Sequence, residues 1–266
     1  MSVPLWVSEL AGAFWGQAGG GEPFPRGLRR PLALGAFDVT VREMAGLSVR
    51  GAERYLADLG FGWPSAAADR PLRACLVAFA GGAFLFLDAD DPPAEQTFSL
   101  AHEVAHFLRD YWQPRCRAAS ALGEGILDVL DGVRPPRRAE RLHGLLRGVP
   151  VRGHVHLMAR DGGLMTAAVA GAEADADRLA WELLAPEAEV RARLPEGAGA
   201  GKAASLLCEA FGLPATVALV YAAVLFPPPL PCDPLTERLK KALAARRTSA
   251  DPGEPITGGN CDEPRA

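Results

Sequence analysis

The chain has 266 residues, of which 49% are hydrophobic and 23% are charged, a composition typical of a globular protein with its own buried core. This composition excludes a disordered, collagen-like or coiled-coil protein. The 28 lysines and arginines stand against 32 aspartates and glutamates, and the formal net charge of −4 makes nucleic acid an unlikely direct ligand.

Cysteines and apolar segments indicate the cellular compartment. The five cysteines are scattered and form no CxxC pair, which disfavours a disulfide framework or a cysteine-ligated zinc site. Residues 1–21 lack the basic start of a signal peptide, and the longest uncharged apolar stretch, 213–226, is too short to span a bilayer. We therefore expect a cytoplasmic protein with no membrane partner.

The first part of the chain, residues 1–66, predicts a helical segment. Apolar residues at helical spacing predict a helix over 4–16. Residues 40–45 begin with the Thr-x-x-Glu pattern of a capping box and predict a short helix, and Ser48 is placed to cap a longer one. The two helices within 41–59 would resemble a helix-turn-helix, so DNA binding there is an alternative to simple helix packing.

The second part, residues 67–226, contains two pairs of apolar runs that predict a small antiparallel sheet. Runs 72–80 and 83–89 flank two glycines and predict a hairpin, and runs 153–159 and 164–170 flank an Asp-Gly pair and predict another. With helices expected elsewhere, the fold class is α+β and mainly helical.

Two further features subdivide the chain. Residues 112–168 look like an insertion, and residues 200–211 and 214–226 predict a C-terminal pair of helices. The third part, residues 227–266, begins with a stiff Pro-rich linker, continues as a short helix and ends in a tail of disordered composition.

An HExxH motif lies in a helix predicted over 97–111. His102 and His106 are four residues apart, so both imidazoles lie on one helix face and can reach one metal ion. Glu103 is placed to take a proton from a water on the metal and to pass it to a leaving amine. Without a metal, these polar groups on an otherwise apolar helix would be costly to bury.

A catalytic zinc site needs a third protein ligand and keeps one position for water. The remaining histidines, His143, His154 and His156, are candidates. Glu173 is the better candidate, because it lies on the apolar face of a helix predicted over 172–185.

Asp177 lies one turn after Glu173 on the same face, where two carboxylates require a cation or a strong donor. Asp177 could accept the second N–H of a metal-bound histidine and so fix that ring. Alternatively, both acids lie at the start of the helix because the helix dipole favours negative charge there.

Three further side chains are candidate transition-state stabilisers. His154 and His156 alternate on a predicted strand and so share one face, from which either could donate a proton to an oxyanion. Tyr111 is a candidate for the same role. A structural role is the alternative for each of them.

Six arginines cluster within the insertion. They form either a solvated loop or a docking surface for an acidic partner or nucleic acid. They are Arg134, Arg137, Arg138, Arg141, Arg147 and Arg152.

The segments FSLAHEVAHFL at 98–108 and EADADRLAWELLAP at 173–186 resemble the ImmA/IrrE family of zinc peptidases. In that family an HExxH helix, entered from a short sheet, is followed by a helix with the pattern ExxA(N/D)xxAxxLL(M)P. The hairpin at 72–89 and the helices at 205–225 also fit, so the resemblance covers roughly 70–226. The chain departs from the family in its insertion and in Ala185, where the family often has Met.

This resemblance implies a zincin-like peptidase domain. By this resemblance His102, His106 and Glu173 hold the zinc, Glu103 is the general base and Asp177 supports a ligand. Mn²⁺ or Fe²⁺ would accept the same ligands. Characterised members cleave a repressor protein and release stress-response or mobile-element genes, which implies a zinc-dependent endopeptidase with a repressor-type protein substrate.

Two alternatives from other functional classes remain open. One is a transcriptional regulator that reads DNA through 41–59 or 205–225 and uses zinc only structurally. The other is a partner-binding protein whose proteolysis is vestigial.

For the peptidase, an extended substrate could pair with the edge of the 72–89 hairpin. The oligomeric state is left open.

Overall fold

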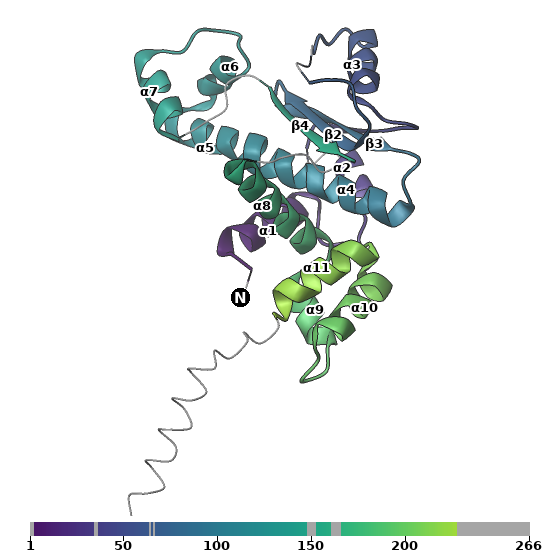
Figure 1. Ribbon diagram of the computed structural model, residues 1–266. Coiled ribbons are helices and arrows are strands. Elements are labelled where there is room, and N and C mark those ends of the chain that lie inside the picture. The colour runs from purple at the N-terminus through teal and green to yellow at the C-terminus, as the bar shows by residue number, and fades with distance from the viewer. Residues whose placement is uncertain are drawn as a thin grey trace, which may run out of the picture. The chain divides into compact units, whose positions relative to one another are not determined.

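The computed structural model describes residues 3–34, 37–63, 65, 67–147, 153–160 and 166–227, without the side chains of residues 143–147 (Figure 1). The linker, short helix and tail expected over 227–266 lie outside these residues from 228 onward. Within the described residues, no helix combines the length and the apolar character that crossing a membrane requires.

The described part is mainly helical with one small sheet, which confirms the α+β fold class. The helices are α1 (Leu5–Gln17), α2 (Arg29–Ala33), α3 (Val49–Asp58), α4 (Pro93–His106), the π-helix η1 (Phe107–Trp112), α5 (Gln113–Leu122), the 3-10 helix η2 (Glu124–Ile126), α6 (Leu127–Leu130), α7 (Arg138–Arg147), α8 (Ala167–Leu184), α9 (Glu187–Arg193), α10 (Ala200–Phe211) and α11 (Ala215–Leu225). The strands are β1 (Val39–Met44), β2 (Leu72–Phe79), β3 (Gly82–Asp88) and β4 (His154–Ala159).

The sheet is mixed rather than purely antiparallel, with the strand order β1-β3-β2-β4. Strands β2 and β3 form the expected hairpin, and β4 pairs antiparallel with β2. The helix expected over 40–45 was wrong: these residues belong to β1, which pairs in parallel with β3. The β-branched residues Val39, Thr40 and Val41 favour a strand, and pairing with β3 outweighs the short capping pattern.

The second predicted hairpin was also wrong, although its first strand exists as β4. Its expected partner, 164–170, overlaps the start of α8, where the Thr166 side chain accepts a hydrogen bond from the N–H of Val169. A short apolar run does not distinguish a strand from a helix start. β4 instead pairs with β2, so that His156 lies opposite Leu76.

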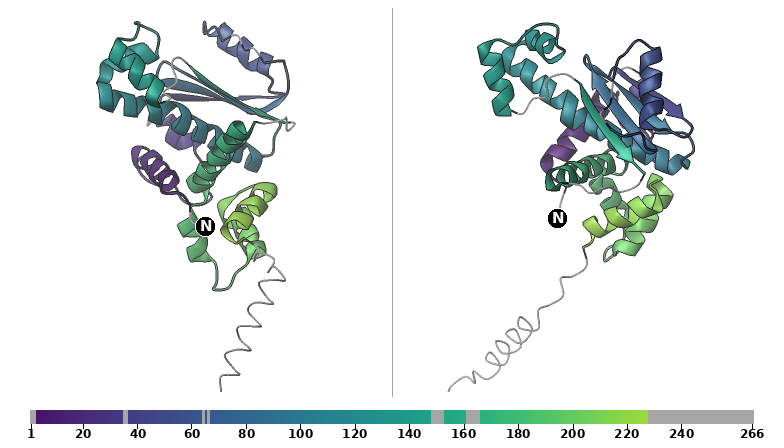
Figure 2. Two further views of the ribbon diagram at one scale, coloured as in Figure 1. Left: turned by 60° about the vertical axis from the view of Figure 1, so that its left-hand side comes forward. Right: turned by 45° about the horizontal axis from the view of Figure 1, so that its top comes forward.

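The sheet is covered on both faces, which explains why β2 and β3 are almost continuously apolar. Figure 2 shows α3 on one face and α4 on the other. Cys75, Val77 and Phe86 pack with the buried residues of α3. The alternate positions, such as Leu76 and Leu85, pack with the apolar side of α4. The side chain of Ser48 caps α3 by accepting from the N–H of Gly51, as expected.

Helix α8 packs against α4, and α1 packs against α8 (Figure 2). The indole N–H of Trp15 on α1 donates to the carbonyl of Leu183 on α8. The apolar residues Ala176, Ala180, Leu183 and Leu184 are all buried on one side of α8. This packing brings the N-terminal half of α8 beside the HExxH residues.

Candidate metal centre

The HExxH residues lie in the last turn and a half of α4, between the sheet and α8. His102, Glu103 and His106 are 3%, 0% and 2% exposed. The chain continues from α4 directly into the π-helix η1, a feature that recurs at functional sites. The polar residues of the motif are therefore fully inside the protein and need buried partners.

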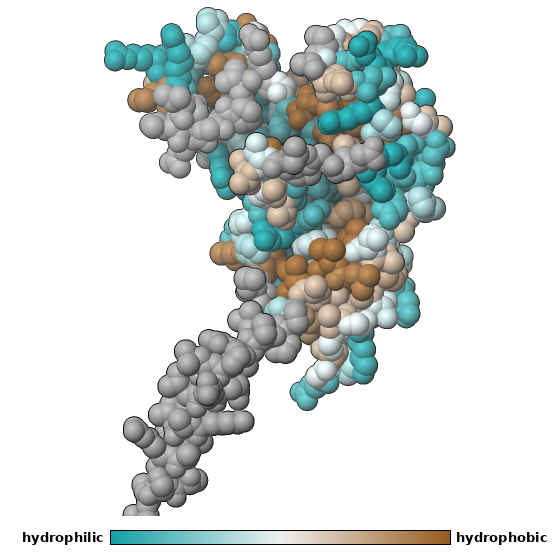
Figure 3. Space-filling view, in the orientation of Figure 1, coloured by the Kyte–Doolittle hydropathy of each residue, from teal (hydrophilic) through white to brown (hydrophobic). Residues whose placement is uncertain are grey.

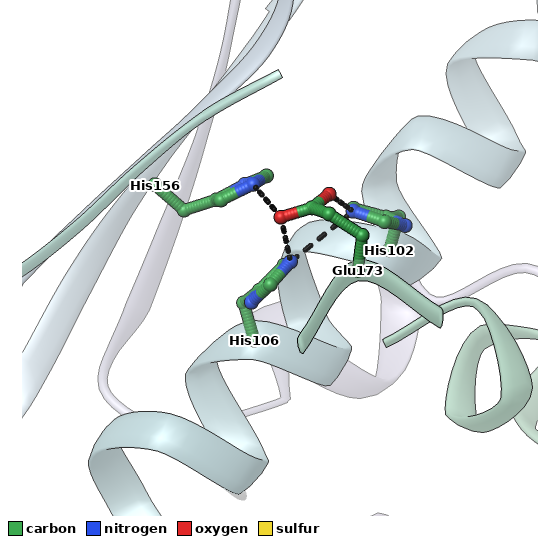
Figure 4. A group of neighbouring side chains, drawn as sticks. All are labelled: His102, His106, His156 and Glu173. Carbon is green, nitrogen blue, oxygen red and sulfur yellow. Dashed lines mark hydrogen bonds and ion pairs between the residues drawn. The ribbon is translucent and has the colours of Figure 1, made fainter. Parts of the chain in front are cut away.

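Four side chains from three elements converge beside α4, as Figure 4 shows. One donor atom from each of His102, His106, His156 and Glu173 lies within 4.8 Å of all the others. The Nε2 atoms of His102 and His106 lie 3.2 Å apart. Glu173 contacts all three rings: its Oε2 lies 3.2 Å from His102 Nε2, and its Oε1 lies 3.6 Å from His106 Nε2 and 3.0 Å from His156 Nε2.

The other ring nitrogen of each histidine has a carboxylate partner. His102 Nδ1 lies 2.9 Å from Asp177 Oδ1, and His106 Nδ1 lies 2.8 Å from Asp110 Oδ2. His156 Nδ1 lies 3.0 Å from both carboxylate oxygens of Glu103. A carboxylate accepts hydrogen bonds, so each Nδ1 carries a proton and each ring directs its Nε2 toward the cluster.

This donor set fits a divalent metal ion. Three Nε2 atoms and the carboxylate of Glu173 face one another at hydrogen-bond distance, an arrangement that requires protons or a metal cation among them. A zinc ion with four ligands at about 2.0–2.1 Å places neighbouring donors roughly 3.3–3.4 Å apart, close to the separations found here. The buried histidine and glutamate cluster therefore indicates a metal site.

The pKa values show how strongly the cluster favours positive charge. Burial alone would lower the pKa of His102, but hydrogen bonds to Asp177 and Glu173 outweigh burial and raise it to about 9. Burial acts the same way on His156, where Glu103 and Glu173 raise the pKa to about 10. Burial would raise the pKa of Glu173, but its histidine partners hold it well below its ordinary value.

Asp110 is a site residue that our sequence analysis missed. Burial opposes its ionisation, but hydrogen bonds from His106 and Arg109 lower its pKa to about 2. Arg109 also donates to the carbonyl of Ala172, next to Glu173, and so joins η1 to α8. The signal was present in the sequence, because Asp110 follows His106 by four residues and lies on the same helix face.

The structure places Glu173 in the second turn of α8, six residues after the helix begins at Ala167. Attraction to the helix dipole acts on the first turn and therefore does not account for this position. Glu173 and Asp177 both contact His102, as expected for a pair of acids one turn apart.

Of the other candidates, His154 lies beside the cluster, with its Nε2 4.0 Å from Asp110 Oδ2. Tyr111 is directed elsewhere: its phenol is buried in the core and its hydroxyl accepts the N–H of Gly81 in the β2–β3 turn. This contact ties the Tyr111 hydroxyl to the turn, and its role as a transition-state stabiliser stays a prediction. The side chain of His143 is outside the described residues.

The arginine cluster of the insertion is partly neutralised. Arg134 binds both carboxylate oxygens of Glu140, whose pKa it lowers to about 2. Arg147 and Arg152 lie outside the described side chains. The first arginine of the cluster is thus engaged within the chain.

Comparison with known proteins gives one match. Residues 63–120 match the IrrE N-terminal-like domain, a peptidase family. The match includes the β2–β3 hairpin and the HExxH residues of α4, and it ends before β4 and α8. No curated protein and no solved structure matches the chain. The family match points to a zincin-type peptidase.

Proposed function

Because residues 63–120 belong to the ImmA/IrrE peptidase family, we propose that the chain is a metal-dependent endopeptidase. The observation that carries the proposal is the convergence of His102, His106 and Glu173 from two helices next to the buried carboxylate of Glu103. These three residues would hold the metal, with zinc as the first choice and Mn²⁺ or Fe²⁺ as alternatives.

The chain's own residues divide the chemistry between them. The metal, when bound, would polarise the scissile carbonyl and acidify the attacking water. Glu103 would take the proton of that water and deliver it to the departing nitrogen. Asp177 and Asp110 hold the rings of His102 and His106 through their Nδ1 atoms, which keeps each Nε2 directed at the site.

The position of the sheet favours a particular substrate path. We expected a substrate strand at the edge of the 72–89 hairpin, but β3 and β4 occupy both sides of β2, and β1 and β2 occupy both sides of β3. In the part of the chain that the structure describes, the sheet edge beside the site belongs to β4. An extended peptide added to β4 would pass the face that carries His154 and His156.

We further propose that the substrate is a repressor-type regulatory protein in a stress-response or mobile-element circuit. This identification is supported by the family resemblance alone. The test incubates the full-length, zinc-loaded protein with small DNA-binding repressors encoded near its gene, with and without EDTA, and compares it with Glu103→Gln. The proposal expects EDTA-sensitive cleavage by the wild type only. Cleavage that survives EDTA or the substitution would contradict it.

The alternative of a DNA-binding regulator is weakened by two observations. The helix pair expected within 41–59 does not exist, because its first member is the strand β1. Residues 205–225 contain no lysine or arginine, and Lys202 is the one lysine or arginine within α10 and α11, which leaves this pair poor in cations for phosphate contacts.

A further inference from the structure

His156 supplies a fourth donor atom to a site whose proposed chemistry needs only three. Figure 4 shows its ring reaching from β4 toward Glu173, on the opposite side from α4. Its Nε2 lies 3.0 Å from Glu173 Oε1, and its ring stacks on that of His106 with 3.8 Å between ring centroids. His156 is therefore within the cluster rather than beside it.

The fold fixes this position independently of any metal. The register of β4 on β2 sets His156 opposite Leu76, on the face of the sheet that α4 covers. Glu103 accepts from the Nδ1 of His156, just as Asp177 and Asp110 accept from the Nδ1 of the two helix histidines. A carboxylate on the second ring nitrogen is the usual support of a metal-bound histidine, and here all three rings have it.

We propose that His156 is a fourth protein ligand of the metal and that it holds the site in a closed resting state. This inference rests on the proposed peptidase function. Four protein donors complete a tetrahedron, whereas a catalytic site keeps one position open. The Nδ1 of the same imidazole also lies within hydrogen-bond distance of both carboxylate oxygens of Glu103. Withdrawal of His156 therefore frees a coordination position and the general base together.

The element that carries His156 suits this role. Among the described strands, β4 lies at an edge of the sheet and pairs with β2 alone. An extended substrate that adds to β4 contacts the strand that carries the closing imidazole, so substrate binding and opening are coupled through one element. The sequence left His156 open as a candidate ligand and as an oxyanion donor. The oxyanion role differs in a measurable way, because such a donor leaves only two imidazoles on the metal.

The first test counts the coordinated imidazoles. Full-length protein with ¹⁵N-labelled histidine is titrated with one equivalent of Zn²⁺, and the ring nitrogens are observed by long-range ¹H–¹⁵N NMR. We expect three Nε2 resonances to shift in the wild type, two in His156→Ala and three in the control His154→Ala, which lacks an imidazole on the same strand. Two shifted resonances in the wild type would overturn the assignment, whether or not His156→Ala folds.

The second test measures closure. His156→Ala is expected to bind zinc roughly 100-fold more weakly than the wild type, by competition with a chromophoric chelator. At saturating zinc it should nevertheless cleave casein, an unstructured substrate, faster than the wild type. Slower cleavage by the variant would overturn the resting-state inference. Three coordinated imidazoles with no cleavage by either protein would instead contradict the peptidase proposal, so the two failures are distinguishable.

Discussion

The neighbouring residues His102 and Glu103 have different proposed roles, metal ligand and general base. They are adjacent in sequence and both buried, yet the Nε2 of His102 faces Glu173 while the carboxylate of Glu103 faces His156 on the sheet side. Glu103→Gln keeps the shape of the side chain and an oxygen that accepts from His156. We expect unchanged zinc content and a loss of turnover of about 100-fold to 10,000-fold, measured on the same preparation. Wild-type turnover in this variant would remove the general-base role.

A substitution at Asp110 tests whether the carboxylates behind the histidine rings strengthen metal binding. Asp110→Asn weakens the hydrogen bond that orients His106, so we expect the affinity for zinc to fall about 10-fold to 100-fold. The control is Asp175→Asn, which removes a nearby, exposed carboxylate that pairs with Arg178 and Arg109 rather than with a cluster histidine. An equal loss of zinc affinity in both variants would indicate a general electrostatic effect rather than a specific role of Asp110 in orienting His106.

At the scale of elements, the local patterns were predictable and the partners of distant segments were not. The i, i+4 spacing of the HExxH histidines and the apolar stripe of α8 identified the two helices that bring His102 and Glu173 together. The pairing of β1 with β3, and of β4 with β2, depends on contacts between segments far apart in the chain, which local periodicity does not encode. The place of His156 in the cluster follows from the β2–β4 register, and for that reason the sequence left His156 as one of three candidate histidines.

The anchoring of β4 can be tested at Arg160, which follows the strand. Its guanidinium pairs with Asp88 and Asp91, which are 3% and 8% exposed. Arg160→Met leaves both carboxylates without this partner, so we expect a loss of about 1–3 kcal/mol in the free energy of unfolding, with faster hydrogen exchange in β4. The exposed pair Arg178–Asp175 is the control, and Arg178→Met should cost less than about 1 kcal/mol. Similar losses would argue against a special role for the Arg160 pairs.

At the scale of the whole molecule, metal binding and folding are coupled, because the donors come from α4, β4 and α8 and converge only in the folded chain. Zinc at about 1,000 times its Kd would stabilise the native state by about 4 kcal/mol. For a protein of this size, this corresponds to a rise in Tm of roughly 10 °C. Calorimetry with and without zinc measures it, and an equal rise in Glu173→Ala would place the binding elsewhere.

The proposed peptidase function depends most on one cation held between α4 and α8. The direct measurement is the zinc content of the purified full-length protein after dialysis, for the wild type and for Glu173→Ala, by mass spectrometry of the metal. We expect about one zinc per wild-type chain and a large loss in the variant. A wild type without stoichiometric metal after zinc loading, or a variant that retains it fully, would contradict the assignment of the site.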